Sequence, residues 1–224
     1  MNATIRWRVL PLGEAALLVE GTPADDLTNR AVIALARALD AAALPGALPS
    51  VPAVSSLLIP FDPLRLPAVE LEAMIWRLLA ELAPAPDSPE RVVEIAVRYG
   101  GADGPDLLDV AAQVGMTPQA VVALHIAPIY RVLLIGFAPG FPYLGPLPEP
   151  LRLPRRSTPR TKVPAGSVAI AADMSGIYPA VLPGGWHLLG RTEQSLFDPH
   201  ADPPSLLEPG VGVRFVPSAD GIQP

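Results

Sequence analysis

Hydrophobic residues in the first 83 positions follow two spacings, one typical of strands and one typical of helices. Together they predict a unit with both α and β structure. Apolar positions that alternate with polar ones indicate half-buried strands, and apolar positions spaced three or four apart indicate helices. A turn at Gly13 separates the first two strands, and Asp25 or Asp26 is placed to cap the first helix. The predicted strands are 5–10, 16–20 and 53–61, and the predicted helices are 27–43 and 67–83.

Each predicted helix has one apolar face, which is the face that a small core would bury. Proline near the start of 67–83 suits a first helical turn. The apolar face of 27–43 consists of Ala31, Val32, Leu35 and Leu39, and that of 67–83 consists of Leu71, Met74, Ile75, Leu78 and Leu82.

The segment Pro84-Ala85-Pro86-Asp87-Ser88-Pro89 predicts a linker, and the pattern changes after it. Short apolar runs then alternate with glycine and proline, which is typical of a barrel or a sandwich. Two short helices interrupt this region. The predicted strands are 92–98, 130–137, 167–171, 186–190 and 211–216, and the helices are 107–114 and 118–125. We therefore predict an α+β domain over 1–84 and a strand-rich domain over 90–224.

Composition excludes several classes of function. A net charge of −6 argues against general nucleic-acid binding, which needs a basic face. The chain has no cysteine and three scattered histidines, so we expect no metal site. Charged residues and prolines break the longer apolar stretches, so we expect no signal peptide and no membrane span, and we expect a cytoplasmic protein.

A basic stretch between residues 152 and 162 is the first candidate binding site. It contains five cations and no acid: Arg152, Arg155, Arg156, Arg160 and Lys162. Arginine binds carboxylate or phosphate through two parallel hydrogen bonds, and lysine adds a point charge. The stretch is either an anion site or a solvated loop whose arginines pair with acids elsewhere, and the flanking prolines favour the anion site.

Each of the other candidate residues has both a functional and a structural explanation. The glycine-rich loop 136–145 follows a predicted strand and either offers backbone N–H groups to an anion or forms a tight barrel corner. His125 and His187 are candidate general acids or bases, although a lone histidine is more often structural. Tyr178 and Trp186 either wall a pocket or pack in the core. The chain has neither a Walker A loop nor a G-x-G-x-x-G motif, so it shows no nucleotide site of its own.

Several long motifs, in order along nearly the whole chain, resemble one known family. That family includes the B subunit of the prokaryotic 5-oxoprolinase, the allophanate hydrolase subunit 1 domain and an inhibitor of a sporulation histidine kinase. The motifs are Leu12-Gly13, Val51-Pro52-Ala53, Tyr99-Gly100-Gly101, Leu124-His125 and the segments 136–145, 154–167 and 183–192.

The resemblance implies a small N-terminal α+β domain followed by a cyclophilin-like β-barrel. It also implies a protein that is not active alone and that works with the homologous C subunit and the A subunit of the 5-oxoprolinase complex. The complex would use ATP to open 5-oxo-L-proline to L-glutamate, since phosphorylation of the lactam oxygen makes a resonance-stabilised amide reactive toward water. ATP would be used by the complex, and no motif places it on this chain.

Under this hypothesis, residue chemistry assigns roles to the candidates. Arg160 and Lys162 hold a carboxylate or phosphate, with Arg155 and Arg156 as secondary contacts and Arg191 in the same pocket. Loops at Gly140 and Gly185 supply backbone donors, and His125 or His187 moves protons. Two alternatives stay open: a regulatory protein that docks on a histidine kinase, and a component of urea degradation similar to allophanate hydrolase subunit 1.

Overall fold

The computed structural model describes residues 5–82, 88, 89 and 91–223. The chain divides into two compact units, Met1–Asp87 and Ser88–Pro224. Residues 84–87 of the predicted linker and residue 83, the predicted end of the second helix, lie outside the described residues.

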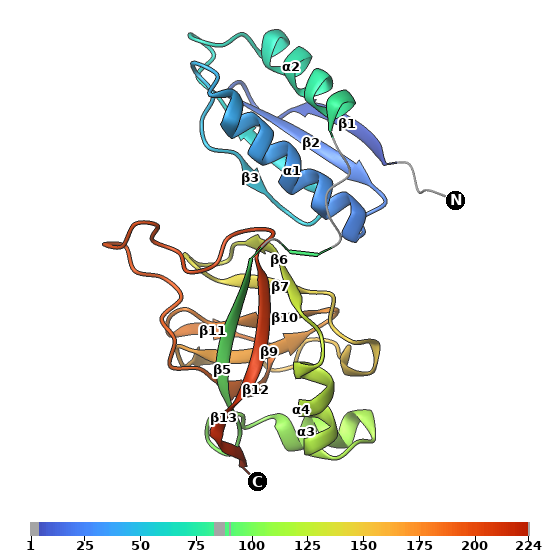
Figure 1. The fold of residues 1–224 in the computed structure, drawn as a ribbon, viewed down its shortest axis with the longest axis vertical. Helices are drawn as coiled ribbons and strands as arrows, with labels where there is room; N and C mark the ends of the chain where they lie inside the picture. Colours follow the sequence, from blue (N-terminus) through green and yellow to red (C-terminus); the bar gives the residue numbers. More distant parts are fainter. Residues whose placement is uncertain (1–4, 83–87, 90, 224) are drawn as a thin grey trace. The chain divides into compact units, whose positions relative to one another are not determined.

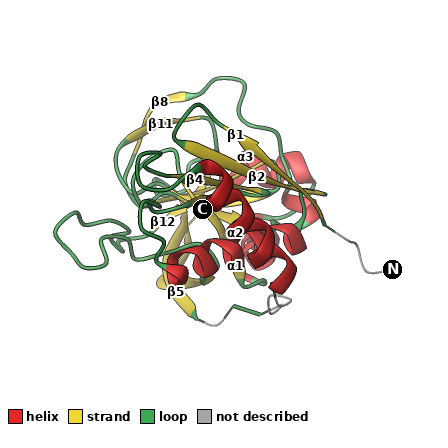
Figure 2. Ribbon diagram, turned by 90° about the horizontal axis from the view of Figure 1, so that it is seen from above, coloured by secondary structure: helices red, strands yellow, loops and turns green. Residues whose placement is uncertain are grey.

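The first unit is an antiparallel sheet with two helices on one of its faces (Figures 1 and 2). The order of its strands across the sheet is β1-β2-β4-β3. The elements are β1 (Arg6–Pro11), β2 (Ala16–Thr22), α1 (Asp26–Ala42), β3 (Val51–Pro52), β4 (Ser56–Pro60) and α2 (Ala68–Glu81).

Local sequence explains how these elements begin and end. The carboxylate of Asp25 accepts a hydrogen bond of 2.9 Å from the Thr28 N–H and caps α1, as predicted. The predicted apolar face of α1 is buried, and Leu71 and Ile75 supply the buried positions of α2. The predicted strand over 53–61 corresponds to β4 but begins later, at Ser56, because residues 53–55 form a tight turn in which the Ala53 N–H donates to the Ser56 carbonyl.

The second unit is built on a closed barrel, which confirms the predicted barrel fold. In the described part of the chain its strands close in the order β10-β7-β6-β13-β5-β12-β9, and β8 and β11 pair as a separate ribbon. Strand β13 runs parallel to β5 and antiparallel to β6. The strands are β5 (Val92–Gly100), β6 (Tyr130–Ile135), β7 (Pro142–Gly145), β8 (Arg160–Val163), β9 (Ser167–Ala171), β10 (Met174–Ile177), β11 (Leu182–Gly184), β12 (His187–Arg191) and β13 (Gly212–Gln223).

Two short helices of the second unit precede β6 in the chain and contact each other (Figure 1). They are α3 (Leu107–Val114) and α4 (Pro118–Ile126), and a 3₁₀ turn spans Glu149–Leu151. The Thr117 side chain caps α4 by accepting a hydrogen bond from the Ala120 N–H. No single helix in the described ranges has the length and apolarity of a membrane span, and α3 and α4 meet that test only as a pair bent by 93°.

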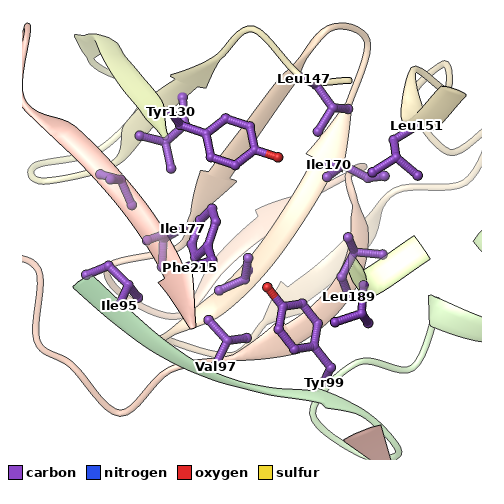
Figure 3. Packing of buried hydrophobic residues seen from close by; sticks show 14 of the residues in the cluster. Ile95, Val97, Tyr99, Tyr130, Leu147, Leu151, Ile170, Ile177, Leu189 and Phe215 are labelled. Carbon is purple, nitrogen blue, oxygen red and sulfur yellow. The ribbon is translucent and has the colours of Figure 1, made fainter. Parts of the chain in front are cut away.

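The barrel interior is a packed core rather than a channel (Figure 3). Alternation along β5 turns Ile95, Val97 and Tyr99 inward, where they meet Phe215 from β13 and Tyr130 from β6. Each of these five side chains is at most 1% exposed. Side chains therefore fill the interior of the barrel.

A second apolar cluster includes residues of the β8–β11 ribbon. Val163 of β8 is a buried member of the cluster, and Leu182 of β11 packs against it. Tyr178 and Trp186 lie in this cluster and are 1% and 6% exposed. Of the two roles considered for these side chains, core packing is the one that the structure shows.

Candidate functional site

Asp106 anchors the basic stretch to the body of the barrel. It lies just before α3 with 2% of its surface exposed. One carboxylate oxygen accepts from Arg160 Nη1 and from the Leu188 N–H, both at 2.8 Å. The other accepts from Arg160 Nη2 and Arg156 Nη1, both at 2.7 Å. A single buried carboxylate thus ties α3, β8, β12 and the 152–160 segment together.

The partners of Asp106 keep its carboxylate charged although the residue is buried. Burial alone would raise the pKa of this carboxyl group, but hydrogen bonds from Arg160 and the Leu188 N–H, with the charges of Arg160 and Arg156, set its pKa below the ordinary value. The same hydrogen bond raises the pKa of Arg160. The carboxylate and Arg160 are therefore ionised at neutral pH.

Four of the five cations of the basic stretch fall into two groups, and the fifth, Arg152, donates from Nε to the Leu147 carbonyl at 3.1 Å. Arg156 and Arg160 pair with Asp106. Arg155 and Lys162 are exposed, and within the described part of the chain their side chains make no hydrogen bond or ion pair. Two of the predicted anion contacts are therefore held in place internally, and the other two are available to an anion.

A cavity of about 370 Å³ opens beside this stretch. It brings together the adjacent predicted residues Arg155 and Arg156 with His187, which lies in another part of the chain. Its other lining residues are Gln113, Pro154, Ser157 and Thr158. The lining offers guanidinium groups, hydroxyls, an amide and an imidazole, which suits a small polar ligand with a negative charge.

His187 has a defined orientation in the wall of this cavity. It is 5% exposed at the start of β12, and its Nε2 lies 2.9 Å from the carbonyl oxygen of Pro154. Because a carbonyl oxygen only accepts, Nε2 carries the proton, and in the neutral ring Nδ1 holds the lone pair. This arrangement fits a base or an acceptor at Nδ1.

His125 lies elsewhere, in the sealed interior of the barrel. Its ring is 0% exposed, stacks on Phe215 with centroids 4.6 Å apart, and contacts Tyr99 and Ser175 through its two nitrogens at 2.9 Å each. Burial lowers its pKa to about 3. The ring lines neither of the cavities described in this unit, so the structure does not support the predicted role of His125 in proton transfer.

Arg191 lines a different cavity of about 540 Å³. Its Nε donates to the Ala165 carbonyl at 2.9 Å, and its Nη1 lies 3.9 Å from Asp103. Arg98 lines the same cavity and pairs with Asp103 at 2.8 Å and with Glu193 at 2.6 Å. The structure therefore separates Arg191 from the cavity of His187, contrary to the prediction of one shared pocket.

The two predicted glycine positions differ in their surroundings. Gly140 is buried in a left-handed conformation at φ +76°, and a Cβ there would lie 2.6 Å from Cβ of Phe197. Gly185 lies beside the basic stretch, where its carbonyl accepts a hydrogen bond of 2.8 Å from the Arg156 N–H. Close packing explains the glycine at 140, and Gly185 is next to the candidate site.

Asp106 and Gln113 are the site residues that sequence reasoning missed. The available signal for Asp106 was an acid between Gly104-Pro105 and an apolar helix, but only the fold shows which cations reach it. In the described ranges no group of three or more His, Asp or Glu side chains is placed to hold a metal ion.

Comparison with known proteins places the chain among its relatives. A family model for the carboxyltransferase domain, subdomain C and D, matches residues 7–207. The chain is 43% identical to the 5-oxoprolinase B subunit of Escherichia coli O157:H7, covering 97% of this chain and 99% of that protein. It is 37% identical to the 5-oxoprolinase B subunit of Bacillus subtilis (strain 168), covering 95% and 93%.

Solved structures agree with the fold. The crystal structure of TTHA0988 superposes with a TM-score of 0.80 at 43% identity, covering 94% of this chain. This chain spans only 41% of that longer chain. The Kluyveromyces lactis urea amidolyase superposes with a TM-score of 0.71 at 20% identity over 96% of this chain and 15% of that one, a likeness of fold alone. The chain belongs to the family of the carboxyltransferase domain, subdomain C and D, and within it resembles the proteins named as the B subunit of 5-oxoprolinase.

Proposed function

We propose that this chain is a subunit of an ATP-dependent 5-oxoprolinase that opens 5-oxo-L-proline to L-glutamate. The observation that carries the proposal is the match, over almost the full length of both proteins, to relatives named as the B subunit of 5-oxoprolinase. The name of these relatives supports an assembly with other subunits. We propose that its partners are the homologous C subunit and the A subunit of that complex.

The His187 cavity is the proposed substrate site on this chain. 5-Oxo-L-proline carries one carboxylate and one amide, and the cavity offers Arg155 for the carboxylate with polar groups for the amide. Lys162 is the exposed cation of β8 proposed to contact a carboxylate or phosphate. Arg156 and Arg160, held by Asp106, fix the shape of the stretch and add positive potential.

The chemistry explains why cations and an oriented imidazole are useful here. An amide carbon is a poor electrophile, and ATP supplies the driving force by activating the lactam oxygen. Negative charge then gathers near the substrate, where fixed guanidinium groups stabilise it most because they need no reorganisation. His187, oriented by the Pro154 carbonyl, is the proposed acceptor or donor of a proton through Nδ1.

Reconstitution tests the proposal. Glutamate formation from 5-oxo-L-proline and ATP is measured with this chain alone, with its proposed partner subunits alone, and with all of them together. We expect activity only in the complete mixture. Absence of glutamate in a complete mixture whose components are folded and bound to one another would show that this chain serves another amide substrate or a regulatory role.

A further inference from the structure

Two buried polar atoms in the wall of the His187 cavity have no hydrogen-bond partner among the described residues. They are Nε of Arg156 and Nδ1 of His187. Buried polar atoms are nearly always paired, so an unpaired one needs a physical explanation. Both side chains line the same cavity, which makes a ligand in that cavity the simplest explanation.

The chemical character of the two atoms is opposite. The Nε of arginine carries a hydrogen at every accessible pH, so it is an unpaired donor. The Nε2 of His187 donates to the Pro154 carbonyl, so Nδ1 of the neutral ring is an unpaired acceptor. Of the other guanidinium nitrogens, Nη1 of Arg156 already donates to Asp106.

We infer that this donor and acceptor recognise a cis amide, the form that an amide takes inside a lactam ring. A ring of five atoms forces C=O and N–H onto the same edge of the amide, whereas the trans amide of an open chain places them on opposite edges. The lactam oxygen accepts from Nε of Arg156, and the lactam N–H donates to Nδ1 of His187. The inference rests on the proposed function for the identity of the lactam as 5-oxo-L-proline.

The carboxylate of such a ligand also has a partner in the cavity. Arg155 lines the cavity, is exposed and makes no ion pair within the described ranges, so it is available to the ring carboxylate. The two unpaired atoms are themselves covered, so binding requires the exposed side chains of residues 155, 157 and 158 to move aside, while the Pro154 carbonyl keeps its contact with Nε2 of His187. The ion pair with Asp106 holds Arg156 in place.

The test compares 5-oxo-L-proline with the lactone in which oxygen replaces the ring N–H. Both ligands have the same shape and the same carboxylate, but only the lactam can donate to Nδ1. Dissociation constants are measured by calorimetry on the full chain, alone and mixed with its partner subunits, for the wild type, His187→Phe and the exposed control His200→Phe. We expect the wild type and His200→Phe to bind the lactam about tenfold more tightly than the lactone, and His187→Phe to lose that preference.

A measurement on the wild type tests the same inference if the His187→Phe variant does not fold. The ¹⁵N chemical shift of Nδ1 of His187 should move on addition of the lactam and stay unchanged with the lactone. Equal binding of both ligands by the wild type, an unchanged preference in a folded His187→Phe, or no binding of the lactam in any mixture would overturn the inference.

The experiments distinguish failure of this inference from failure of the proposed function. Glutamate formation by the complete mixture without a lactam preference would retain the proposed function and reject the recognition by Nδ1. A preference that depends on His187, in a complete mixture that forms no glutamate, would retain the lactam site and reject the proposed reaction.

Discussion

The hydroxyl of Tyr99 lies 2.9 Å from Nδ1 of His125, and both groups are sealed inside the barrel. On the other side of the ring, Nε2 lies 2.9 Å from the hydroxyl of Ser175, which in turn lies 3.2 Å from the Ala169 carbonyl oxygen. The carbonyl only accepts, so Ser175 donates to it and accepts from Nε2–H, and Tyr99 donates to Nδ1. The chain of contacts thus fixes a neutral ring with its proton on Nε2.

Replacing His125 by alanine should destabilise the barrel strongly. The change leaves a cavity and removes the partners of two buried hydroxyl groups, which together lower the free energy of unfolding by about 3 kcal/mol. Urea unfolding followed by circular dichroism measures the loss. His200→Ala, at an exposed loop position, is the matched control and should change stability by less than about 0.5 kcal/mol. Equal stability of the two variants would contradict the role given to His125.

The same histidine should make stability depend on pH. Its folded pKa is lowered to about 3 from an ordinary 6.5, so between these values the unfolded chain binds a proton that the folded chain does not. Stability therefore falls as the pH decreases from 6.5 toward 3, by at most about 1.4 kcal/mol per pH unit. Comparing unfolding of the wild type and His125→Gln at several pH values isolates this contribution, which the variant should lack.

Titration of the ring gives an independent check. The ¹⁵N shifts of His125 should stay constant from pH 8 down to about pH 5, because the folded ring remains neutral over that range. A midpoint for His125 near its ordinary value would show that the ring reaches solvent.

Sequence patterns predicted much of the architecture because short-range periodicity records which face of each element is buried. Alternation along 92–98 and the helical spacing of 27–43 correspond to β5 and α1. The strand predicted over 53–61 is present as β4, but it starts at Ser56 because residues 53–55 make a turn that apolar spacing does not reveal. The β8–β11 ribbon was also not predicted, because its strands are short and β11 is interrupted by proline.

The candidate site was predicted less completely, since it depends on contacts between distant residues. His125 follows the same helix pattern whether its ring faces solvent or the barrel, and only the packing of α4 against β13 decides. Asp106 and Arg160 are separated by 54 residues, so no local motif joins them. The convergence of Arg155, Arg156 and His187 likewise follows from the closure of the barrel.

Asp106→Asn should loosen the basic stretch. The amide keeps the shape but removes the charge that two arginines share, and loss of one member of a buried pair is strongly destabilising. Because both arginines are partly exposed, solvent offsets part of the loss, and we expect a decrease of about 2 kcal/mol in the free energy of unfolding. Asp109→Asn, at an exposed position of the helix α3 that follows Asp106, is the control. Comparable midpoints in urea for the two variants would count against the anchoring role.

Gly140→Ala and Gly185→Ala should distinguish a glycine that close packing requires from a glycine that lies beside the candidate site. At Gly140 a methyl group meets Cβ of Phe197 in a left-handed backbone, so we expect a loss of about 2 kcal/mol in stability. At Gly185 the nearest atoms to a new Cβ are 3.7 Å away, so stability should change by less than about 1 kcal/mol. Thermal unfolding measures both. A lower rate of glutamate formation in a stable Gly185→Ala would place that loop at the site.

Arg160→Ala and Lys162→Ala should both reduce glutamate formation by the complete complex, for different reasons. Arg160→Ala removes two hydrogen bonds to Asp106, so stability falls together with activity. Lys162 is exposed and contributes charge alone, so its variant should keep the wild-type melting temperature and lose activity through a higher KM for substrate. Arg77→Ala, in the exposed part of α2, controls for a general loss of charge. Full activity of both Arg160→Ala and Lys162→Ala, with folding verified by circular dichroism, would show that the basic stretch is not the anion site.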